Sequence, residues 1–502
     1  NVFFHKTNRF YCHFQIKNLI FHTTFPGSTF EQAKSHPRDV AVLSPEVKTP
    51  IPGPKSKELM GHVQNFQNTK ALSFFCDFER SKANYLVDAD ENIILDCFQQ
   101  ISSMPLGYNN TELIAVGKQD NLQNLLINRP AMVTFADMNF PRLVHDSLLR
   151  VAPEGLSNVI TMGCGSCANE NAYKAAFLWY MRDRRGYELP PAEDDEAYSS
   201  CVMNQVPGSP KLSMLSFEGG LHGRTLAALS TTHTRPLLKL DMPAFDWPIA
   251  PFPKLKYPLE EHESENAKEE ARCLAVVEDL ITEWSKRAPV AGIVVEPIQA
   301  EGGDNHASDD FFRKLRKIAL KHSVAFVVDE VQTGVAITGK WWAHEHWGLE
   351  TPPDIVTFAK KMFIGGYYFN DKVNWKTPSR IGNTWMGDPA KLHLLKKTIE
   401  IVKEQRLKDN AQHTGNYLTE SLKSLENIHS TALEGSRGRG LFCAVDVNGS
   451  RDKVVKEMLQ RGVLVGASGP NSIRFRPSLI FTPTHVDIAM DRLDQVLTSV
   501  KI

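Results

Sequence analysis

Cysteine is scarce in this chain and is scattered along it. Eight cysteines occur among 502 residues. Small secreted domains that depend on disulfides carry a far denser and more regular set. The scarcity therefore argues against a disulfide framework and favours a reducing intracellular compartment.

Two further absences narrow the class of protein. The chain has no excess of either charge, with 57 Lys and Arg against 58 Asp and Glu, so nothing electrostatic favours nucleic acid or an anionic membrane as a partner. It also lacks long apolar runs, since residues 291–295 and 324–328 are far too short to span a bilayer. We therefore expect a soluble globular protein that binds neither nucleic acid nor a membrane.

The N-terminal segment lacks acidic residues. It contains Lys6, Arg9 and Lys17, and its first acidic residue is Glu31. A basic segment without acids is typical of a mitochondrial transit peptide. We expect residues 1–45 to be a transit or disordered segment, and the protein to act in the mitochondrial matrix.

From about residue 110 to 370, short buried strands alternate with amphipathic helices. Residues 291–295 and 324–328 are wholly apolar, which is typical of parallel strands covered on both faces. Residues 309–321 between them have the periodicity of a helix. This order predicts an α/β fold with a mostly parallel sheet covered by helices.

The flanking segments have a different pattern. Residues 88–92 form a turn signal between two strand-like pieces, and helices are expected at 56–66, 390–404 and 411–425. Strand signals follow at 440–445 and 472–475. We predict a large domain over residues 111–385 and a smaller α+β domain built from both chain ends, 46–110 and 386–502.

Charged residues follow three of the predicted strands. Glu296, Asp329 and Lys360 each stand where an apolar run ends. A single charge can simply end a strand. Three at the carboxyl edge of one sheet predict a ligand site, because open α/β sheets bind ligands there.

Two glycine-containing turns add to this site. Residues 163–170 precede a predicted helix at 171–182, and backbone N–H groups at a helix start bind phosphate well. Residues 219–225 form a second turn, which displays His222 and Arg224. Either turn alone would be weak support for a site.

A phosphate-binding turn, an Asp that ends one strand and a Lys that ends another resemble the pyridoxal-phosphate aminotransferases of fold type I. More narrowly, the chain resembles the class III ω-aminotransferases, and among these the members that act on 4-aminobutyrate. The stretches that carry this resemblance are residues 100–103 (QISS), 164–167 (CGSC), 222–225 (HGRT), 245–253 (FDWPIAPFP), 296–299 (EPIQ), 301–306 (EGGDNH), 329–334 (DEVQTG) and 473–477 (IRFRP).

The resemblance implies roles for the residues around pyridoxal 5′-phosphate. Lys360 would bond covalently to the cofactor and move a proton during catalysis, and Asp329 would pair with the pyridine nitrogen. The adjacent Lys361 is expected to be a solvated charge. The other implied cofactor contacts are Gly165, Ser166, Gln332 and, from the second subunit of a homodimer, Thr384.

The resemblance also implies how substrates are recognised. Arg224 would bind the carboxylate of 4-aminobutyrate and the distal carboxylate of 2-oxoglutarate, and Arg474 would bind the α-carboxylate of glutamate or 2-oxoglutarate. Glu301 would pair with Arg474 whenever the substrate lacks an α-carboxylate. Ile101 and Glu296 would line the pocket. The implied reaction converts 4-aminobutyrate and 2-oxoglutarate into succinate semialdehyde and L-glutamate.

Cys164 and Cys167 form a C-x-x-C pair next to the predicted phosphate turn. The resemblance implies that the pairs of two subunits hold a [2Fe–2S] cluster between them. Two cysteines alone equally fit a thioredoxin-like redox motif, zinc or empty thiols.

Several residues depart from the family pattern near the site. Leu221 and Gly382 stand where the family places aromatic residues, and Phe98 stands where tyrosine is frequent. Residues 335–337 (VAI) replace a glycine- and serine-rich turn, which would strain Val335 and Ile337 if that turn needs positive φ. These departures keep two alternatives open: an ω-aminotransferase for ornithine or β-alanine, and a degenerate dimer that binds the cofactor without catalysis.

Overall fold

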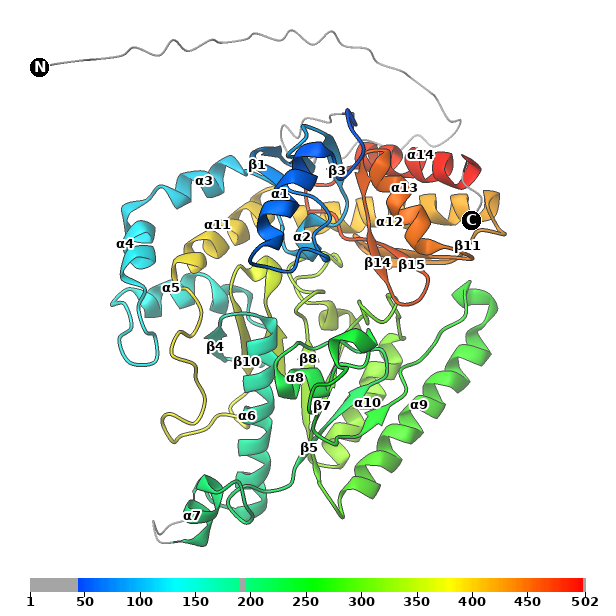
Figure 1. The fold of residues 1–502 in the computed structure, drawn as a ribbon. Coiled ribbons are helices and arrows are strands. Elements are labelled where there is room, and N and C mark those ends of the chain that lie inside the picture. Colours follow the sequence, from blue (N-terminus) through cyan, green and yellow to red (C-terminus); the bar gives the residue numbers. More distant parts are fainter. Residues whose placement is uncertain (1–43, 190–194, 500–502) are drawn as a thin grey trace, which may run out of the picture. The chain divides into compact units, whose positions relative to one another are not determined.

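A seven-stranded sheet carries the predicted strand-end residues (Figure 1). The computed structural model describes residues 44–189 and 195–499, all within one unit of the chain that spans His36–Ile502. Only β10 runs against its neighbours in this sheet. In spatial order the strands are β4 (Asn158–Met162), β10 (Gly365–Phe369), β9 (Ile355–Phe358), β8 (Ala325–Asp329), β7 (Val290–Val295), β5 (Ser213–Phe217) and β6 (Ile249–Ala250).

Helices cover both faces of this sheet, as the wholly apolar strands predict. In β8, Ala325 and Val327 pack on the side of helix α6 (Gly165–Arg185). Phe326 and Val328 point to the opposite face, where they join the core formed with helices α9 (Glu263–Trp284) and α10 (Asp309–Lys321). Alternate side chains of one strand thus pack into two cores, one on each face of the sheet. Polar residues are accommodated where the strands end.

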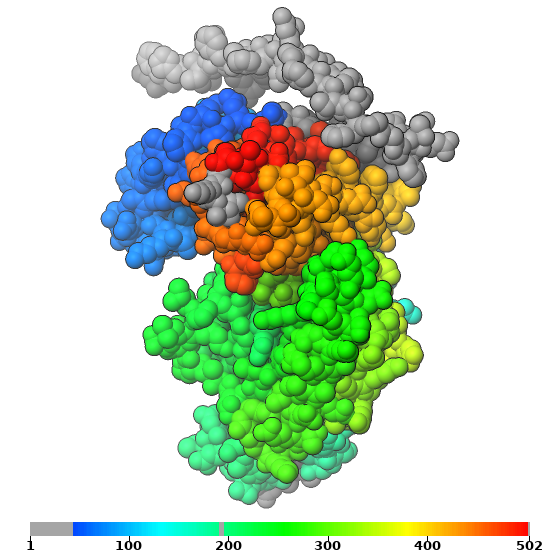
Figure 2. Space-filling view, turned by 90° about the vertical axis from the view of Figure 1, so that its right-hand side faces the viewer, coloured from blue at the N-terminus to red at the C-terminus, as the bar shows by residue number. Residues whose placement is uncertain are grey.

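A second sheet joins the two ends of the described chain. Strands β1 (Cys76–Lys82), β2 (Tyr85–Asp88) and β3 (Ile93–Asp96) are followed in space by β13 (Val463–Leu464), which pairs parallel to β3. The Ile51 N–H donates to Gln460 Oε1 at 3.0 Å, across 409 positions of sequence. Figure 2 shows the corresponding blue and orange-to-red surfaces side by side.

A third sheet and four helices complete the C-terminal part. The sheet order is β11 (Leu433–Arg439), β12 (Phe442–Val447), β15 (Ser472–Phe475) and β14 (Gly466–Ser468). The helices are α11 (Ala390–Glu404), α12 (Leu407–Ile428), α13 (Arg451–Gln460) and α14 (Pro483–Ser499). Both chain ends contribute to neighbouring sheets, but the domain boundaries themselves stay a prediction.

The remaining helices are short, apart from α1. They are α1 (Pro54–Gln64), α2 (Gln99–Ser102), α3 (Thr111–Gly117), α4 (Asp120–Asn128), α5 (Phe140–Asp146), α7 (Glu196–Val202), α8 (Leu226–Ser230) and the 3₁₀ turns η1 (Leu148–Val151), η2 (Pro236–Leu238), η3 (Leu259–Glu261), η4 (Ala343–Trp347) and η5 (Lys360–Met362). Among the described residues, no helix is long and apolar enough to cross a membrane. Residues 1–43 of the expected transit segment lie outside the described part of the chain.

The sequence predictions of fold class and of most elements are confirmed, with two corrections. The helix expected at 171–182 begins at Gly165, so the predicted phosphate turn is itself the first part of α6. In the turn after Gly334, Val335 and Ala336 have φ of +64° and +62°, so the expected strain falls on Val335 but not on Ile337. A β-branched residue in this conformation costs about 1–2 kcal/mol.

Candidate active site

The three strand-end charges meet at one cavity, as predicted. Asp329 is the last residue of β8 and pairs with Thr357 of β9, three residues before Lys360. Glu296 follows the neighbouring strand β7. All three side chains line a cavity of about 1150 Å³. The parallel arrangement of the strands therefore explains how residues far apart in sequence share one site.

Asp329 is buried and fully hydrogen-bonded. Its Oδ2 accepts from His222 Nδ1 at 2.7 Å and from Asn169 Nδ2 at 2.8 Å, and its Oδ1 accepts from the Val331 N–H at 3.0 Å. Burial lowers the pKa of His222, but the hydrogen bond and negative charge of Asp329 outweigh burial and raise it overall. These donors fix the position of the carboxylate, so it can face a cationic ring nitrogen.

The start of helix α6 is a suitable phosphate site. The helix has no side-chain cap at Cys164, which leaves N–H groups of its first turn for a ligand. A Cβ at Gly165 would lie 2.9 Å from Val331 Cγ1, so a larger residue would not fit there. The Arg224 N–H donates to Ser166 Oγ at 3.1 Å, which brings the second glycine-containing turn against the first.

Lys360 enters the cavity from the end of β9, with its Nζ donating to the Ile101 carbonyl at 2.7 Å. Burial lowers the pKa of Lys360 to about 8. A nucleophilic lysine needs this shift, because only the neutral amine has a free electron pair. The structure thus places Lys360 in the same cavity as Asp329 and Glu296.

The segment that receives Lys360 is an unusual left-handed turn. Residues 99–102 all have positive φ, between +48° and +60°, although none is glycine. Such backbone costs about 1–2 kcal/mol per residue and needs support from its surroundings. Asp96 gives this support at one end, where its Oδ1 accepts from the Phe98 and Gln99 N–H groups, both at 2.7 Å.

Lys361 supports the other end of the turn, and the prediction that it is a solvated charge was wrong. Its side chain is 3% exposed. The Nζ donates to the Ser102 carbonyl at 3.2 Å, to Ser102 Oγ at 3.1 Å and to the Gln332 carbonyl at 2.6 Å. Burial lowers the pKa of Lys361 well below its usual range. The residue next to Lys360 is thus part of the frame of the site.

Replacing Lys361 with methionine should therefore destabilise the protein. The substitution keeps most of the volume but leaves the Ser102 and Gln332 acceptors without a donor. We expect a loss of about 1–3 kcal/mol in the free energy of unfolding, measured by denaturant titration. The matched control is Lys317→Met on the exposed face of α10. An equal, small effect of both substitutions would contradict the supporting role of Lys361.

The predicted pairing of Glu301 with Arg474 is present. Arg474 Nη2 donates to Glu301 Oε1 at 2.7 Å, and both side chains are buried. Burial raises the pKa of Glu301, but the positive charges of Arg474 and Arg235 outweigh it and lower the pKa overall. Arg474 Nε and Nη1 are buried without a hydrogen-bond partner among the described residues. A second arginine, Arg235, also contacts Glu301 and was missed from the sequence.

The other predicted site residues divide into two groups. Ile101, Gln332, Arg224 and Glu296 line the cavity, and Leu221 and Phe98 form part of its wall. Burial raises the pKa of Glu296 to about 7. Thr384 and Gly382 do not line the cavity of their own chain.

Cys164 and Cys167 lie at the start of α6 with their sulfur atoms 3.6 Å apart. Two thiolates bound to one tetrahedral metal at about 2.3 Å each would be roughly 3.7 Å apart. The pair can therefore share a metal. Within residues 44–189 and 195–499, no group of three or more His, Cys, Asp or Glu side chains is arranged to hold a metal ion.

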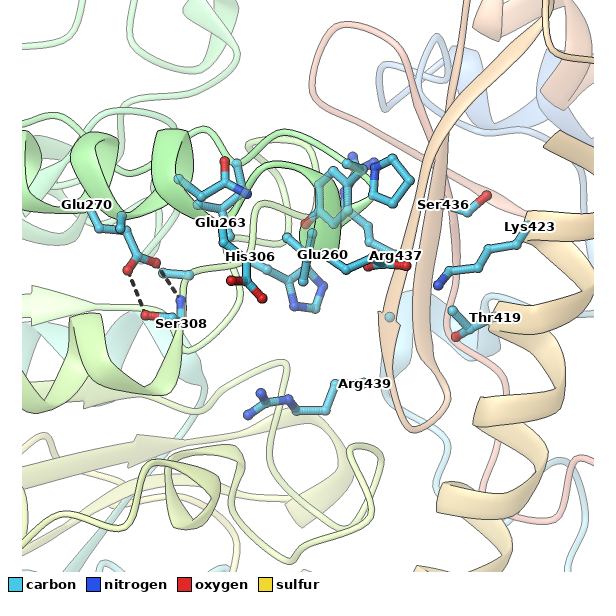
Figure 3. Close-up of a pocket in the computed structure, with 18 of the residues that line it drawn as sticks. Glu260, Glu263, Glu270, His306, Ser308, Thr419, Lys423, Ser436, Arg437 and Arg439 are labelled. Atoms are coloured by element: carbon cyan, nitrogen blue, oxygen red, sulfur yellow. Dashed lines mark hydrogen bonds between the residues drawn. The ribbon is translucent and has the colours of Figure 1, made fainter. Parts of the chain in front are cut away.

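A second cavity, of about 700 Å³, lies between α9 and β11 (Figure 3). His306 and Lys423 approach it from opposite sides. Arg437 in its wall donates to the carbonyl oxygens of Gly303 and Asp304, just after Glu301. This cavity lacks the strand-end residues, and its wall contributes to fixing the segment that carries Glu301.

Residues 66–497 match the family model described as Aminotransferase class-III, and the chain belongs to this family. Membership implies pyridoxal phosphate as the cofactor. The chain is 49% identical over 460 residues to the mitochondrial 4-aminobutyrate aminotransferase of Sus scrofa, with 91% of each chain covered. It is also 49% identical over 455 residues to 4-aminobutyrate aminotransferase of Dictyostelium discoideum, covering 90% of this chain and 91% of that one.

Among solved structures, the fold matches the lysine aminotransferase from M. tuberculosis in the internal aldimine form. The TM-score is 0.78 at 28% identity, covering 89% of this chain and 100% of that chain. The predicted fold type and family are thus confirmed.

Proposed function

We propose that this protein transfers the amino group of 4-aminobutyrate to 2-oxoglutarate, which yields succinate semialdehyde and L-glutamate. The observation that carries the proposal is the buried Glu301–Arg474 pair, in the same cavity as Lys360. The donor 4-aminobutyrate has no α-carboxylate, whereas the acceptor 2-oxoglutarate has one. The same pocket therefore needs an arginine that pairs with Glu301 for the first substrate and is released from it for the second. The names of the similar relatives from Sus scrofa and Dictyostelium discoideum support the same reaction.

The residues of the cavity fit pyridoxal phosphate. The uncapped start of α6 at Gly165 and Ser166 suits the phosphate, the fixed carboxylate of Asp329 suits the ring nitrogen, and Lys360 offers an amine of lowered pKa. Gln332 in the cavity wall would lie beside the phenolic oxygen. When bound, the cofactor supplies the electron sink that makes the proton next to the substrate's amine acidic.

The protein's own side chains then perform three tasks. Asp329 would keep the ring nitrogen protonated. Lys360 would take up the proton released from the substrate carbon and return it to the cofactor carbon bonded to the transferred nitrogen. Arg224 binds the carboxylate that both substrates share, and Ile101 and Glu296 shape the pocket around the chain between amine and carboxylate.

The test is a comparison of amino donors with the cofactor-loaded protein. With 2-oxoglutarate as acceptor, we expect kcat/KM for 4-aminobutyrate to exceed the values for ornithine and β-alanine at least roughly tenfold. A preference for ornithine or β-alanine would identify a different ω-aminotransferase. Bound cofactor without glutamate formation from any donor would identify a degenerate cofactor-binding protein.

Cofactor capture should depend on pH through Lys360. Burial lowers the pKa of Lys360 to about 8, so the fraction of neutral amine rises with pH up to that value and then levels off. We expect the rate at which the apoprotein captures pyridoxal phosphate to rise about tenfold per pH unit below pH 8 and to reach a plateau above it. Stopped-flow absorbance measures this rate. A continued rise to pH 10 would indicate an unshifted lysine.

We also propose a homodimer located in the mitochondrial matrix. Thr384 lies outside the cavity of its own chain, so it could complete the phosphate site only from a second subunit. The similar relative from Sus scrofa is named as mitochondrial. Light scattering of the purified protein and fractionation of cells test these two points; a monomer, or a cytosolic protein, would contradict them.

We propose that Cys164 and Cys167 of two subunits together ligate a [2Fe–2S] cluster. The sulfur separation of 3.6 Å and the exposure of Cys164 support it. Iron and acid-labile sulfide should each amount to one atom per chain, and both should be lost in the Cys164→Ser variant. Zinc alone, or neither metal, would refute the cluster.

A further inference from the structure

Glu301 contacts two arginines, and each contacts a different oxygen atom. Arg474 Nη2 donates to Oε1 at 2.7 Å. Arg235 Nη2 lies 2.5 Å from Oε2, as an ion pair without the alignment of a hydrogen bond. Arg235 belongs to the loop between α8 and η2 and lines the same cavity.

The two arginines differ in their surroundings. The side chain of Arg474 is 2% exposed, whereas that of Arg235 is 49% exposed. Arg474 has two further donors, Nε and Nη1, that are buried and lack a hydrogen-bond partner within the described residues. Arg474 is thus prepared for another carboxylate inside the cavity, while Arg235 stands at its solvent side.

The backbone around Glu301 is firmly held. The Glu301 carbonyl accepts from the Gly469 N–H at 2.9 Å, and Arg437 donates to the carbonyls of Gly303 at 2.6 Å and Asp304 at 3.0 Å. Any rearrangement of Glu301 is therefore confined to its side chain. The carboxylate can leave Arg474 without moving the loop.

Leaving Arg474 is costly for a carboxylate in this position. Glu301 is 7% exposed, and a buried charge that loses its only partner is strongly destabilised. Arg235 changes this balance, because it is a second cation beside Glu301, 2.5 Å from Oε2, that can stay paired when Arg474 is given up. Without Arg235, Glu301 would compete harder with a substrate carboxylate for Arg474.

We propose that Arg235 is a specificity-determining residue that retains the Glu301 carboxylate while Arg474 binds the α-carboxylate of a dicarboxylic substrate. Arg235 acts through Glu301 and does not itself bind the substrate. The inference rests on the proposed function for its choice of substrates. On this proposal, Arg235 supports the binding of 2-oxoglutarate and glutamate. It has little effect on the binding of 4-aminobutyrate, which leaves the Glu301–Arg474 pair intact.

The first test measures binding without chemistry. Glutarate has two carboxylates at the spacing of 2-oxoglutarate, and butyrate has the single carboxylate of 4-aminobutyrate. In titration calorimetry with the cofactor-loaded protein, Arg235→Gln should weaken glutarate roughly tenfold and leave butyrate within about twofold. Equal weakening of both ligands, or no change in either, would overturn the proposal.

A double-mutant cycle separates action through Glu301 from a structural role. In the Glu301→Gln background, the further change Arg235→Gln should alter glutarate affinity by less than about twofold, because the amide carries no charge to retain. Arg235→Lys should recover part of the affinity. Arg287→Gln, which removes an exposed arginine paired with Asp246, is the matched control. A full Arg235→Gln effect in both backgrounds would refute the coupling.

The kinetic counterpart follows each half-reaction separately. Arg235→Gln should lower kcat/KM for 2-oxoglutarate roughly tenfold and leave that for 4-aminobutyrate nearly unchanged. A larger loss with 4-aminobutyrate would mean that Arg235 binds the donor directly, and would overturn the proposal. If the wild type fails to use 4-aminobutyrate at all, the proposed function fails, but the glutarate and butyrate titrations still decide the role of Arg235.

Discussion

Replacing Lys360 with alanine is expected to abolish transamination, with a fall in kcat of at least roughly 10³-fold. Lys360 is the amine that enters the cavity from β9, and in the proposed reaction it serves as both nucleophile and base. Under that proposal, loss of its side chain removes covalent cofactor attachment and proton transfer together. The measurement is glutamate formation from 4-aminobutyrate and 2-oxoglutarate under saturating cofactor.

Two comparisons make this result specific. Lys317→Ala, on the exposed side of α10, should keep full activity. Added methylamine should restore part of the activity of Lys360→Ala, because a small amine can enter the vacated space and act as a base. Activity of the variant within about tenfold of the wild type would mean that another group moves the proton.

The second large effect is expected for Asp329→Asn. The substitution keeps the size of the side chain but removes the negative charge that faces the proposed ring nitrogen. Removing one partner of a buried charge pair costs about 3–5 kcal/mol, which corresponds to a 10²- to 10⁴-fold loss of kcat/KM. Because Asp329 also accepts from His222 at 2.7 Å, the variant should lose the charge that favours a protonated imidazole.

The control is another buried carboxylate that is remote from the cavity. Asp354 accepts from Arg316 Nη1 at 2.7 Å, and Asp354→Asn should lower the free energy of unfolding without changing kcat of the folded protein. Nuclear magnetic resonance of His222 provides an independent readout, since its pKa should fall in Asp329→Asn. Equal losses of kcat in the two variants would show that the effect of Asp329 is structural.

The centre of the main sheet was predictable because residues 291–295 and 324–328 are wholly apolar and the helices beside them are well marked. Helix α10 begins and ends where its pattern indicates, with the Ser308 side chain accepting from the Phe311 N–H at its start. Strand β11 was not predicted, because its sequence LEGSRGR contains two glycines and three charges and looks like a loop. It becomes a strand only through its pairing with β12.

The chemical residues of the site were predictable from motifs, but their supporting residues were not. Lys361 looks like an ordinary surface lysine beside Lys360, and only the folded backbone brings Ser102 and Gln332 around its Nζ. The left-handed turn at residues 99–102 has no glycine to mark it. Arg235 lies in a loop without a distinctive motif; the only signal was its place close behind His222 and Arg224 in the sequence.

The pairing of β13 with β3 has a consequence for the synthesis of the protein. Ile51 and Gln460 contact each other across 409 positions, which a ribosome needs about 20–80 s to translate. During that time β3 has an unpaired edge, and Arg474 does not yet exist. Strands β1, β2 and β3 therefore gain their fourth strand only after β13 has been made, and a chain that stops before residue 463 loses both this sheet partner and the arginine proposed to bind substrate.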